Sequence, residues 1–391
     1  MRTARRLALA RLVSLSGGSA AYIALVAAIY GETGSALWVS AAIFSSVVAS
    51  VASAPFAGWI GDRFDRRSVL IASDIAAAAV SLAMAATAKH PSTLVVLLGL
   101  SSAAQAPFEP ASAAALPNVV PEADVPRANA LVAATSSAGY LLGPLLGGAV
   151  LGLGASPGTV FVVDAGTFVF SAVLVATTGH PFGRGSIEEH PGALAGLRLI
   201  VREPALRMPV LAGMVSLVGI GIVDVASYPL SLNLQGGTAG YGAMTALLGG
   251  GGLLGATLAG RFLRAEPARV LVAAFAAGAA GLGVAGAAPV LAIGLAGMAL
   301  AGAGRGLGDV AAVTLIQARA ADEVRSRVFA AQDGAAHAAF SVSAFTGGLL
   351  VELAGARGAF AAAAAFGIGA ALLAGRAQVP PCATDEGRTA G

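Results

Sequence analysis

Nine ionisable side chains lie inside the long apolar stretches of this chain of 391 residues. In order, they are Arg11, Asp74, Glu109, Asp164, Asp224, Arg305, Asp309, Asp333 and His337. A carboxylate in apolar surroundings is destabilised in its charged form, so it takes up a proton near neutral pH more easily than a carboxylate in water does. Glu109 and Asp224 have no basic residue in their own apolar stretches. We therefore predict that these two side chains bind protons or a cationic substrate.

Asp309 is a third candidate for the same chemistry. Arg305 precedes it by four residues, so the two side chains share one face of a helix and are expected to form a structural pair that neutralises both charges. Asp164 is a weaker candidate, because it lies close to one end of its apolar stretch.

The segment around Glu109 carries further polar groups. Gln105, Glu109 and Ser112 are spaced by four and three residues, which places them on one helical face. Pro107 and Pro110 flank the glutamate, and each removes a backbone N–H donor. We expect a distorted helix here, with free carbonyl groups beside Glu109. Gln105 therefore joins Glu109 as a candidate for the substrate site.

The elements that hold these residues are predicted to be membrane-spanning helices. Hydrophobic residues make up 57% of the chain, charged residues 11%, and the mean hydropathy is +0.82, which exceeds what the core of a water-soluble domain requires. A span needs roughly 20 apolar residues, and twelve such stretches lie between polar breaks. They cover residues 8–30, 36–57, 68–88, 93–117, 128–152, 157–178, 208–232, 239–260, 269–287, 289–316, 328–352 and 357–376.

The basic residues support this layout and orient it. Loops on the cytoplasmic side of a membrane carry most of the Arg and Lys residues. With the N-terminus inside, the cytoplasmic loops hold 19 of the 23 basic residues, whereas the outer loops hold only Lys89 and Arg357. We therefore predict a multi-pass protein of the cell membrane with both termini in the cytoplasm. Arg11, Asp74 and Asp333 then lie near cytoplasmic ends, where water or a partner near the surface is expected to satisfy them.

The longest polar interruption divides the spans into two sets of six. We predict a first six-helix bundle (1–178), a cytoplasmic linker (179–207), a second six-helix bundle (208–376) and a cytoplasmic tail (377–391). "GWIGDRFDRR" at 58 aligns with "ATLAGRFLRA" at 256, and "ADV" at 123 aligns with "DEV" at 322. The offsets of 198 and 199 residues indicate a duplicated six-helix unit. Secondary transporters contain such repeats, with the substrate site near the midplane between them.

The residues from 58 to 70 carry a motif typical of one family. "GWIGDRFDRRSVL" resembles the signature between the second and third helices of the major facilitator superfamily. The matching positions are Gly58, Gly61, Asp62, Arg63, Arg66 and Arg67. The resemblance implies an all-α transmembrane fold of twelve helices, in two pseudo-symmetric halves around a central cavity. It also implies that Asp62 and Arg66 latch onto a helix of the other half when the cytoplasmic side closes. Membrane topology alone also explains the arginines, because a cytoplasmic turn rich in basic residues fixes the orientation of the protein in the membrane.

A second motif bears on the direction of transport. "GYLLGPLLGG" matches the fifth-helix antiporter motif of this superfamily at Gly139, Gly143, Pro144, Gly147 and Gly148. That motif is associated with exporters, although ordinary packing of small residues explains the glycines as well. Asp65 stands where the commoner signature has glycine, and this variant resembles the branch of enterobactin and macrolide exporters.

Other chemistries find little support in the sequence. Gly250, Gly252 and Gly255 have the spacing of a dinucleotide-binding loop, but no strand precedes them, so we expect helix packing instead. The single lysine, Lys89, is not part of a Walker A loop, and Cys382 is the only cysteine. The histidines lack metal-site spacing, and no basic patch with interleaved aromatic residues suits a nucleic acid. We expect no cofactor, no metal and no enzymatic activity.

The sequence thus predicts a secondary exporter that acts as a monomer. It would move a small amphipathic molecule, such as a drug or a siderophore, outward in exchange for protons. Three alternatives remain: an uptake permease of the same fold, a non-transporting receptor or scaffold, and a membrane-embedded enzyme. The antiporter motif argues against uptake, a receptor needs no titrating carboxylate, and no set of residues suits an enzyme.

Overall fold

The secondary structure of the described chain is helical. A computed structural model describes residues 2–178, 182, 198, 200–262, 267–319 and 322–376. The first bundle contains α1 (Arg2–Thr33), α2 (Ala36–Arg63), α3 (Arg66–Ala86), α4 (Pro91–Gln105), α5 (Phe108–Val119), a 3₁₀ turn (Glu122–Asp124), α6 (Val125–Gly152) and α7 (Pro157–Ala176). The second bundle contains α9 (Pro204–Asn233), α10 (Gly237–Phe262), α11 (Pro267–Ala287), α12 (Leu291–Arg319) and α13 (Asp322–Gly375).

The described helices match the twelve predicted spans in length and composition. Within the described residues, 11 helical segments are long and apolar enough to span a bilayer, and one of them joins α4 and α5. The last of these segments contains two crossings, because α13 turns back at Gly355, whose φ of 69° lies in the left-handed region that glycine adopts without strain. The predicted fold, two six-helix halves in a membrane, is confirmed.

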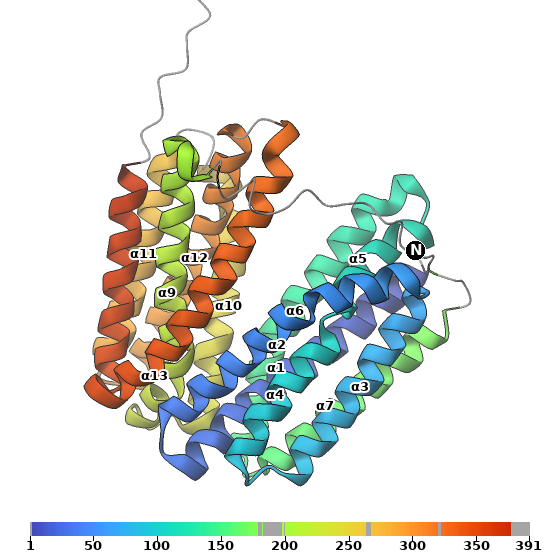
Figure 1. Cartoon of the computed structure of the whole chain (residues 1–391). Coiled ribbons are helices and arrows are strands. Elements are labelled where there is room, and N and C mark those ends of the chain that lie inside the picture. The colour runs from blue at the N-terminus through green and yellow to red at the C-terminus, as the bar shows by residue number, and fades with distance from the viewer. Residues whose placement is uncertain are drawn as a thin grey trace, which may run out of the picture.

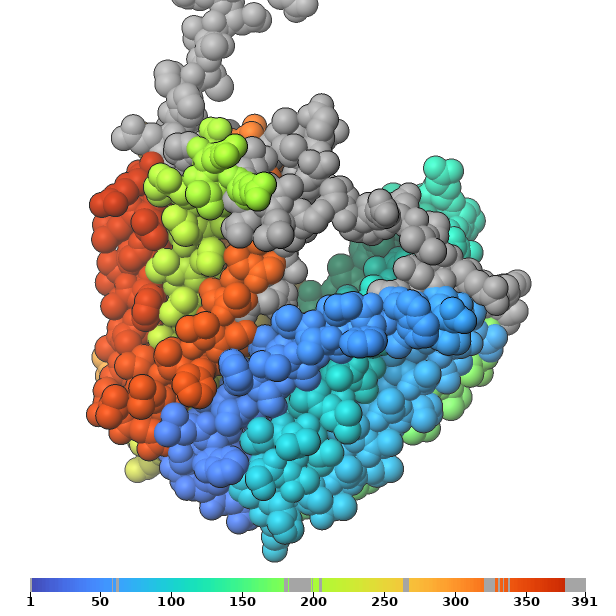
Figure 2. All heavy atoms as spheres, viewed as in Figure 1, coloured from blue at the N-terminus to red at the C-terminus, as the bar shows by residue number. Residues whose placement is uncertain are grey.

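The two bundles meet at one end and diverge at the other (Figure 1). The N-terminus lies at the divergent end of the first bundle, and a hollow separates the bundles on that side (Figure 2). Contact between the bundles runs mainly through α6 against α10 and through α2 against α13. At the closed end, the Ser40 hydroxyl donates to the Ala344 carbonyl at 2.7 Å, and the Phe44 and Phe345 rings lie 5.9 Å apart.

Glycine lets α10 and α12 approach closely within the second bundle. A Cβ atom on Gly251 would overlap the carbonyl oxygen of Ala299, and one on Gly255 would overlap that of Ala303. Gly302 and Gly306 of α12 lie equally close to the backbone of α10. Small residues at four-residue spacing are the usual means of bringing two membrane helices together. The glycine run around 250–255 is thus a helix-packing surface, as predicted.

Because of this packing, the effect of a Gly→Ala substitution on the stability of the protein depends on its position along α10. We expect Gly255→Ala to lower the stability of the purified protein by about 1–3 kcal/mol, because the added methyl group would meet backbone atoms that no rotamer change moves. Gly260→Ala on the same helix is the control, since nothing lies within 4 Å of its Cβ position. Thermal unfolding of both variants in one detergent measures the difference. Equal midpoints would contradict the expectation.

Candidate functional site

A cavity of about 520 Å³ is lined mainly by the first bundle and reaches the second bundle at one residue. Its wall is built from α1, α4, α5, α6 and α7 of the first bundle, and Thr245 of α10 adds a side chain from the second. Gln105 and Glu109, predicted to share a face, both line it. The cavity therefore lies where a substrate between the two halves is expected.

Glu109 reaches the cavity because the chain breaks beside it. α4 ends at Gln105 and α5 begins at Phe108, with Pro107 at the junction, so the distortion predicted from the prolines is confirmed. Glu109 falls in the first turn of α5, where the helix dipole favours a negative charge. On the wall beside it, the Gln105 amide donates to the Ser73 carbonyl at 3.4 Å.

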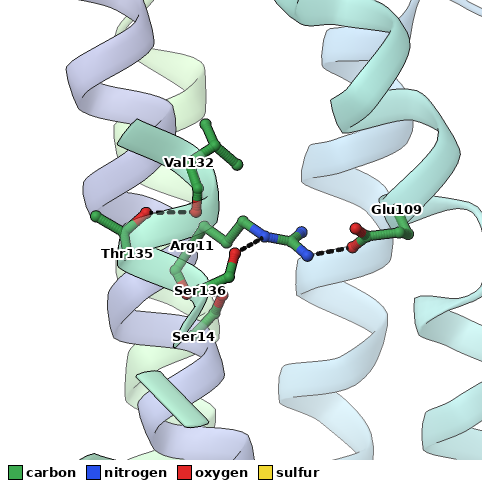
Figure 3. Close-up of polar contacts among 6 residues, drawn as sticks. All are labelled: Arg11, Ser14, Glu109, Val132, Thr135 and Ser136. Atoms are coloured by element: carbon green, nitrogen blue, oxygen red, sulfur yellow. Dashed lines mark hydrogen bonds and ion pairs between the residues drawn. The ribbon is translucent and has the colours of Figure 1, made fainter. Parts of the chain in front are cut away.

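Arg11 of α1 forms an ion pair with Glu109 of α5 (Figure 3). The Arg11 side chain is 10% exposed, whereas that of Glu109 is 69% exposed and faces the cavity. The Arg11 Nε atom also donates to the Ser136 hydroxyl of α6 at 2.6 Å. One buried guanidinium thus joins three helices at the cavity wall. Sequence reasoning foresaw a partner for Arg11 but did not identify Glu109, which lies 98 positions away on another helix.

Asp224 makes a hydrogen bond between the two bundles. The Tyr22 hydroxyl of α1 donates to the Asp224 carboxylate of α9 at 2.6 Å. Tyr22 also lines the cavity, so this bond lies at the cavity wall. The Tyr228 ring stands edge-on to Tyr30 at 5.5 Å and to Tyr241 at 5.4 Å. Sequence reasoning missed Tyr22, since a search for charged groups passes over a phenol.

Arg305 and Asp309 form the pair that their spacing predicted. The Arg305 Nε atom lies 3.7 Å from a carboxylate oxygen of Asp309. Both residues line a second cavity of about 340 Å³ between α6, α10 and α12. Tyr140 of α6 lines both cavities. The pair therefore faces the space between the bundles but lies in a different cavity from Glu109.

Two other predicted carboxylates lie inside the first bundle. Asp164 is 3% exposed and accepts a hydrogen bond from Ser81 at 2.7 Å. Asp74 is fully buried, and its carboxyl oxygens have no hydrogen-bond partner among the described residues. α7 packs along α3 and covers this face, so Asp74 lies inside the bundle, and the expectation that water or a partner near the surface satisfies it stays a prediction. The side chains of Asp333 and His337 lie outside the described part of the structure.

Comparison with known proteins identifies the family. The sequence pattern that defines the Major Facilitator Superfamily matches residues 7–331. The chain belongs to the major facilitator superfamily. It is 30% identical over 323 residues to the uncharacterized MFS-type transporter YfiS of Bacillus subtilis, covering 78% of this chain and 76% of that protein. It is 26% identical over 284 residues to the enterobactin exporter EntS of Citrobacter koseri, covering 69% of this chain and 66% of that protein.

Solved structures show the same facilitator fold. The chain resembles the nucleoside transporter NupG with a TM-score of 0.78 and 13% identity, covering 95% of this chain and 98% of that one. It resembles a bacterial homologue of the iron transporter ferroportin, in its inward-facing state, with a TM-score of 0.73 and 15% identity, covering 96% and 97%. At such identities the likeness concerns the fold alone. The protein is thus a multi-pass membrane transporter of this superfamily and not an enzyme.

The antiporter motif of this facilitator packs α6 against two different helices. Cβ atoms on Gly139, Gly143 and Gly147 would each crowd residues 12–20 of α1 in the same bundle. A Cβ on Gly148 would instead lie 2.9 Å from the Gly242 Cα atom of α10, in the other bundle. Pro144 lines the cavity. The motif therefore packs one bundle internally and also brings the two bundles together at the closed end.

The signature motif lies at the divergent end, and its described hydrogen bonds go to the first bundle and to Phe182, just beyond that bundle. Asp65 begins α3, where its carboxylate accepts from the Ser68 N–H at 3.3 Å and from the Phe182 N–H at 3.2 Å. Its φ of −61° requires no glycine. Arg66 donates to the Ala114 carbonyl at 2.9 Å. Arg67 donates to the carbonyl of Ala176, the last residue of α7.

For the other signature residues the structure gives one contact, that of Arg63. The Arg63 guanidinium lies 5.5 Å from the centre of the Trp59 ring. The side chain of Asp62, and the surroundings of Gly58 and Gly61, lie outside what the structure describes. The predicted latch between Asp62, Arg66 and the other half therefore stays a prediction.

Proposed function

We propose that this facilitator exports a small amphipathic molecule in exchange for protons by alternating access. One observation carries the proposal: a 520 Å³ cavity between the halves has at its wall the Tyr22–Asp224 bond that joins them. A change in the protonation of Asp224 would therefore affect both the substrate site and the contact between the halves. The proton is the proposed coupling ion, and the monomer is the proposed working unit.

The divergent end is proposed to face the cytoplasm of a cell with this protein in its plasma or inner membrane. The arginines of the loops at that end support this orientation through the positive-inside rule. In this assignment both termini are cytoplasmic, residues 1–178 and 208–376 are the two halves, 179–207 is the linker and 377–391 is the tail. The structure then corresponds to an inward-facing state.

Export rather than uptake is supported by the antiporter motif and by the similarity to an enterobactin exporter. Drugs and siderophores are therefore the first substrate classes to test. Gln105 and Glu109 are proposed to contact the substrate, and Arg305 and Asp309 form a second charged pair along the path between the halves. When the divergent end closes, Asp62 and Arg66 are proposed to latch onto the second half.

The proposed exchange cycle uses Asp224 as its proton site. A proton from outside neutralises Asp224 and favours the inward-facing state, in which the carboxyl group is partly buried beside Tyr22. Substrate then enters the cavity from the cytoplasm or the inner leaflet. Release of the proton inward leaves a charge that is costly to keep away from water, so the halves rearrange toward the outward-facing state and release the substrate.

Everted membrane vesicles test this function directly. Vesicles energised by respiration receive lipophilic cations, macrolides or siderophores one at a time, and a fluorescent dye reports the pH gradient. We expect at least one compound to collapse the gradient in vesicles that contain the protein, with no effect in matched vesicles that lack it. Accumulation of a compound in right-side-out vesicles would instead identify an uptake permease, and a gradient that no compound alters would count against proton antiport.

A further inference from the structure

The charges on the cavity wall cancel. Among its lining residues in the described part of the chain, only Arg11 and Glu109 have charged side chains. They are bonded to each other, and Arg11 is also bonded to Ser136. Asp224 does not line the cavity itself and meets its wall only through the bond to Tyr22. For a cationic substrate, the carboxylate that could bind it, that of Glu109, is already paired. For an anionic substrate, the guanidinium that could bind it, that of Arg11, is already paired. Either ion would have to break a bonded pair and leave one partner charge uncompensated.

Hydroxyl groups dominate the rest of the polar wall. Seven of the 15 lining residues carry one. The hydroxyls of Ser19, Ser101 and Tyr140 make no hydrogen bond to any group in the described chain, while Ser102 bonds only the Leu98 carbonyl of its own helix, at 3.1 Å. A hydroxyl both donates and accepts. These groups therefore suit a substrate that has hydroxyl or carbonyl groups of its own.

The same wall also has an apolar part. Phe108 of α5 and Phe168 of α7 line the cavity, and aromatic side chains bind flat apolar groups well. The volume of about 520 Å³ falls within the range of roughly 300–1,000 Å³ that is usual for sites of small molecules. The lining of the cavity thus combines free hydroxyls, two phenyl rings and one pair of opposite charges that are bonded to each other.

We propose that the substrate is a molecule without net charge that carries several hydroxyl or carbonyl groups beside an aromatic or apolar part. The Arg11–Glu109 pair sets this selectivity by keeping the wall electrically balanced, and lipophilic cations are excluded as the preferred class. This inference rests on the proposed transport function and narrows its substrate.

Binding of three glycosides of similar size and different charge tests the inference. The full-length protein in nanodiscs is dialysed against p-nitrophenyl β-glucoside, which is neutral, its glucuronide, which is anionic, and its 2-amino-2-deoxy form, which is cationic. Empty nanodiscs correct for partition into lipid. We expect the wild-type protein to bind the neutral glycoside about tenfold more tightly than either charged one.

Two variants of the pair should reverse this preference in opposite directions. Arg11→Gln leaves Glu109 unpaired, so the cationic glycoside should gain about tenfold over the neutral one. Glu109→Gln leaves Arg11 unpaired, so the anionic glycoside should gain by a similar factor. The double variant Arg11→Gln/Glu109→Gln has a balanced wall again and should return to the neutral preference, which separates charge selectivity from damage to the fold.

Several results would overturn the inference. They are tighter binding of the cationic glycoside by the wild-type protein, preferences that stay the same in all variants, and no binding of any glycoside while vesicles still respond to other compounds. Failure of the transport proposal looks different: the purified protein would bind the neutral glycoside, but energised vesicles would respond to nothing.

Discussion

Asp224→Asn is expected to reduce proton-driven accumulation of substrate to the background of vesicles that lack the protein. Asparagine has nearly the shape of aspartate and still accepts the hydrogen bond that Tyr22 donates at 2.6 Å. It carries no titratable proton, so the exchange of a proton for substrate loses its chemical basis. Exchange of labelled substrate at equal concentrations on the two sides of the membrane should continue at a rate of the same order, because the cavity and its wall are unchanged.

The measurement compares two assays on the same vesicles. Uptake of substrate against a gradient in everted vesicles reports coupling, and exchange of substrate at equal concentrations reports the movement of the halves. Loss of the first with retention of the second is the expected result. Loss of both would indicate that Asp224 only holds the structure together, and retention of both would remove it from the proton path.

Asp164→Asn is the matched control for this substitution. Asp164 is buried, whereas Asp224 is partly buried, and Asp164 likewise accepts a hydrogen bond from a hydroxyl, that of Ser81 at 2.7 Å. It lies within the first bundle, so a proton there does not affect the contact between the halves. Coupling should therefore persist in Asp164→Asn, and an equal loss in both variants would show that burial of a carboxylate, and not its position, explains the effect.

Local features of this fold followed from sequence because their causes are local. Pro107 removes a backbone donor, and the helix breaks beside it, between Gln105 and Phe108. Arg305 and Asp309 are four residues apart on one helix, and they form the expected pair. Each predicted span falls on an observed helical segment, with ends that differ by up to six residues, because the length of a span depends on the thickness of the bilayer and a helix can continue beyond it.

Contacts between distant helices could not be predicted in the same way. Tyr22 and Asp224 are 202 positions apart, and whether they meet depends on how α1 and α9 are rotated about their axes. In an amphipathic helix the apolar stripe indicates that rotation. Both helices have apolar residues on all sides of their membrane segments, so their sequences do not indicate which face turns inward. Arg11 was recognised as a charge within a span, but its partner Glu109 was not.

The antiporter motif of α6 contains both a packing face that the sequence predicts and a contact with a distant helix that it does not. Gly139, Gly143 and Gly147 recur every four residues, and this spacing predicts a single packing face. Gly148 lies about 100° further round the helix, so it cannot belong to that face. Sequence alone gives no partner for it, whereas the structure places Gly242 of the other bundle against it.

Gly148→Leu is therefore expected to prevent the closed end from forming. A Cβ atom at this position would lie 2.9 Å from both the Gly242 Cα atom and the Thr238 carbonyl oxygen. Both neighbours are backbone atoms of α10, so no change of rotamer relieves the overlap. The two halves must separate here, and transport should fall to background, because alternating access requires this end to close once in every cycle.

A disulfide trap measures the closure itself. In a chain with Cys382→Ser, the pair Phe44→Cys and Phe345→Cys replaces two rings that lie 5.9 Å apart at the closed end, and an oxidant should cross-link the halves. Gly148→Leu should remove most of that cross-link. Ala149→Leu, the exposed neighbour on α6, adds the same side chain without meeting α10 and should leave it intact. A strong cross-link in Gly148→Leu would mean that this contact accompanies closure without being needed for it.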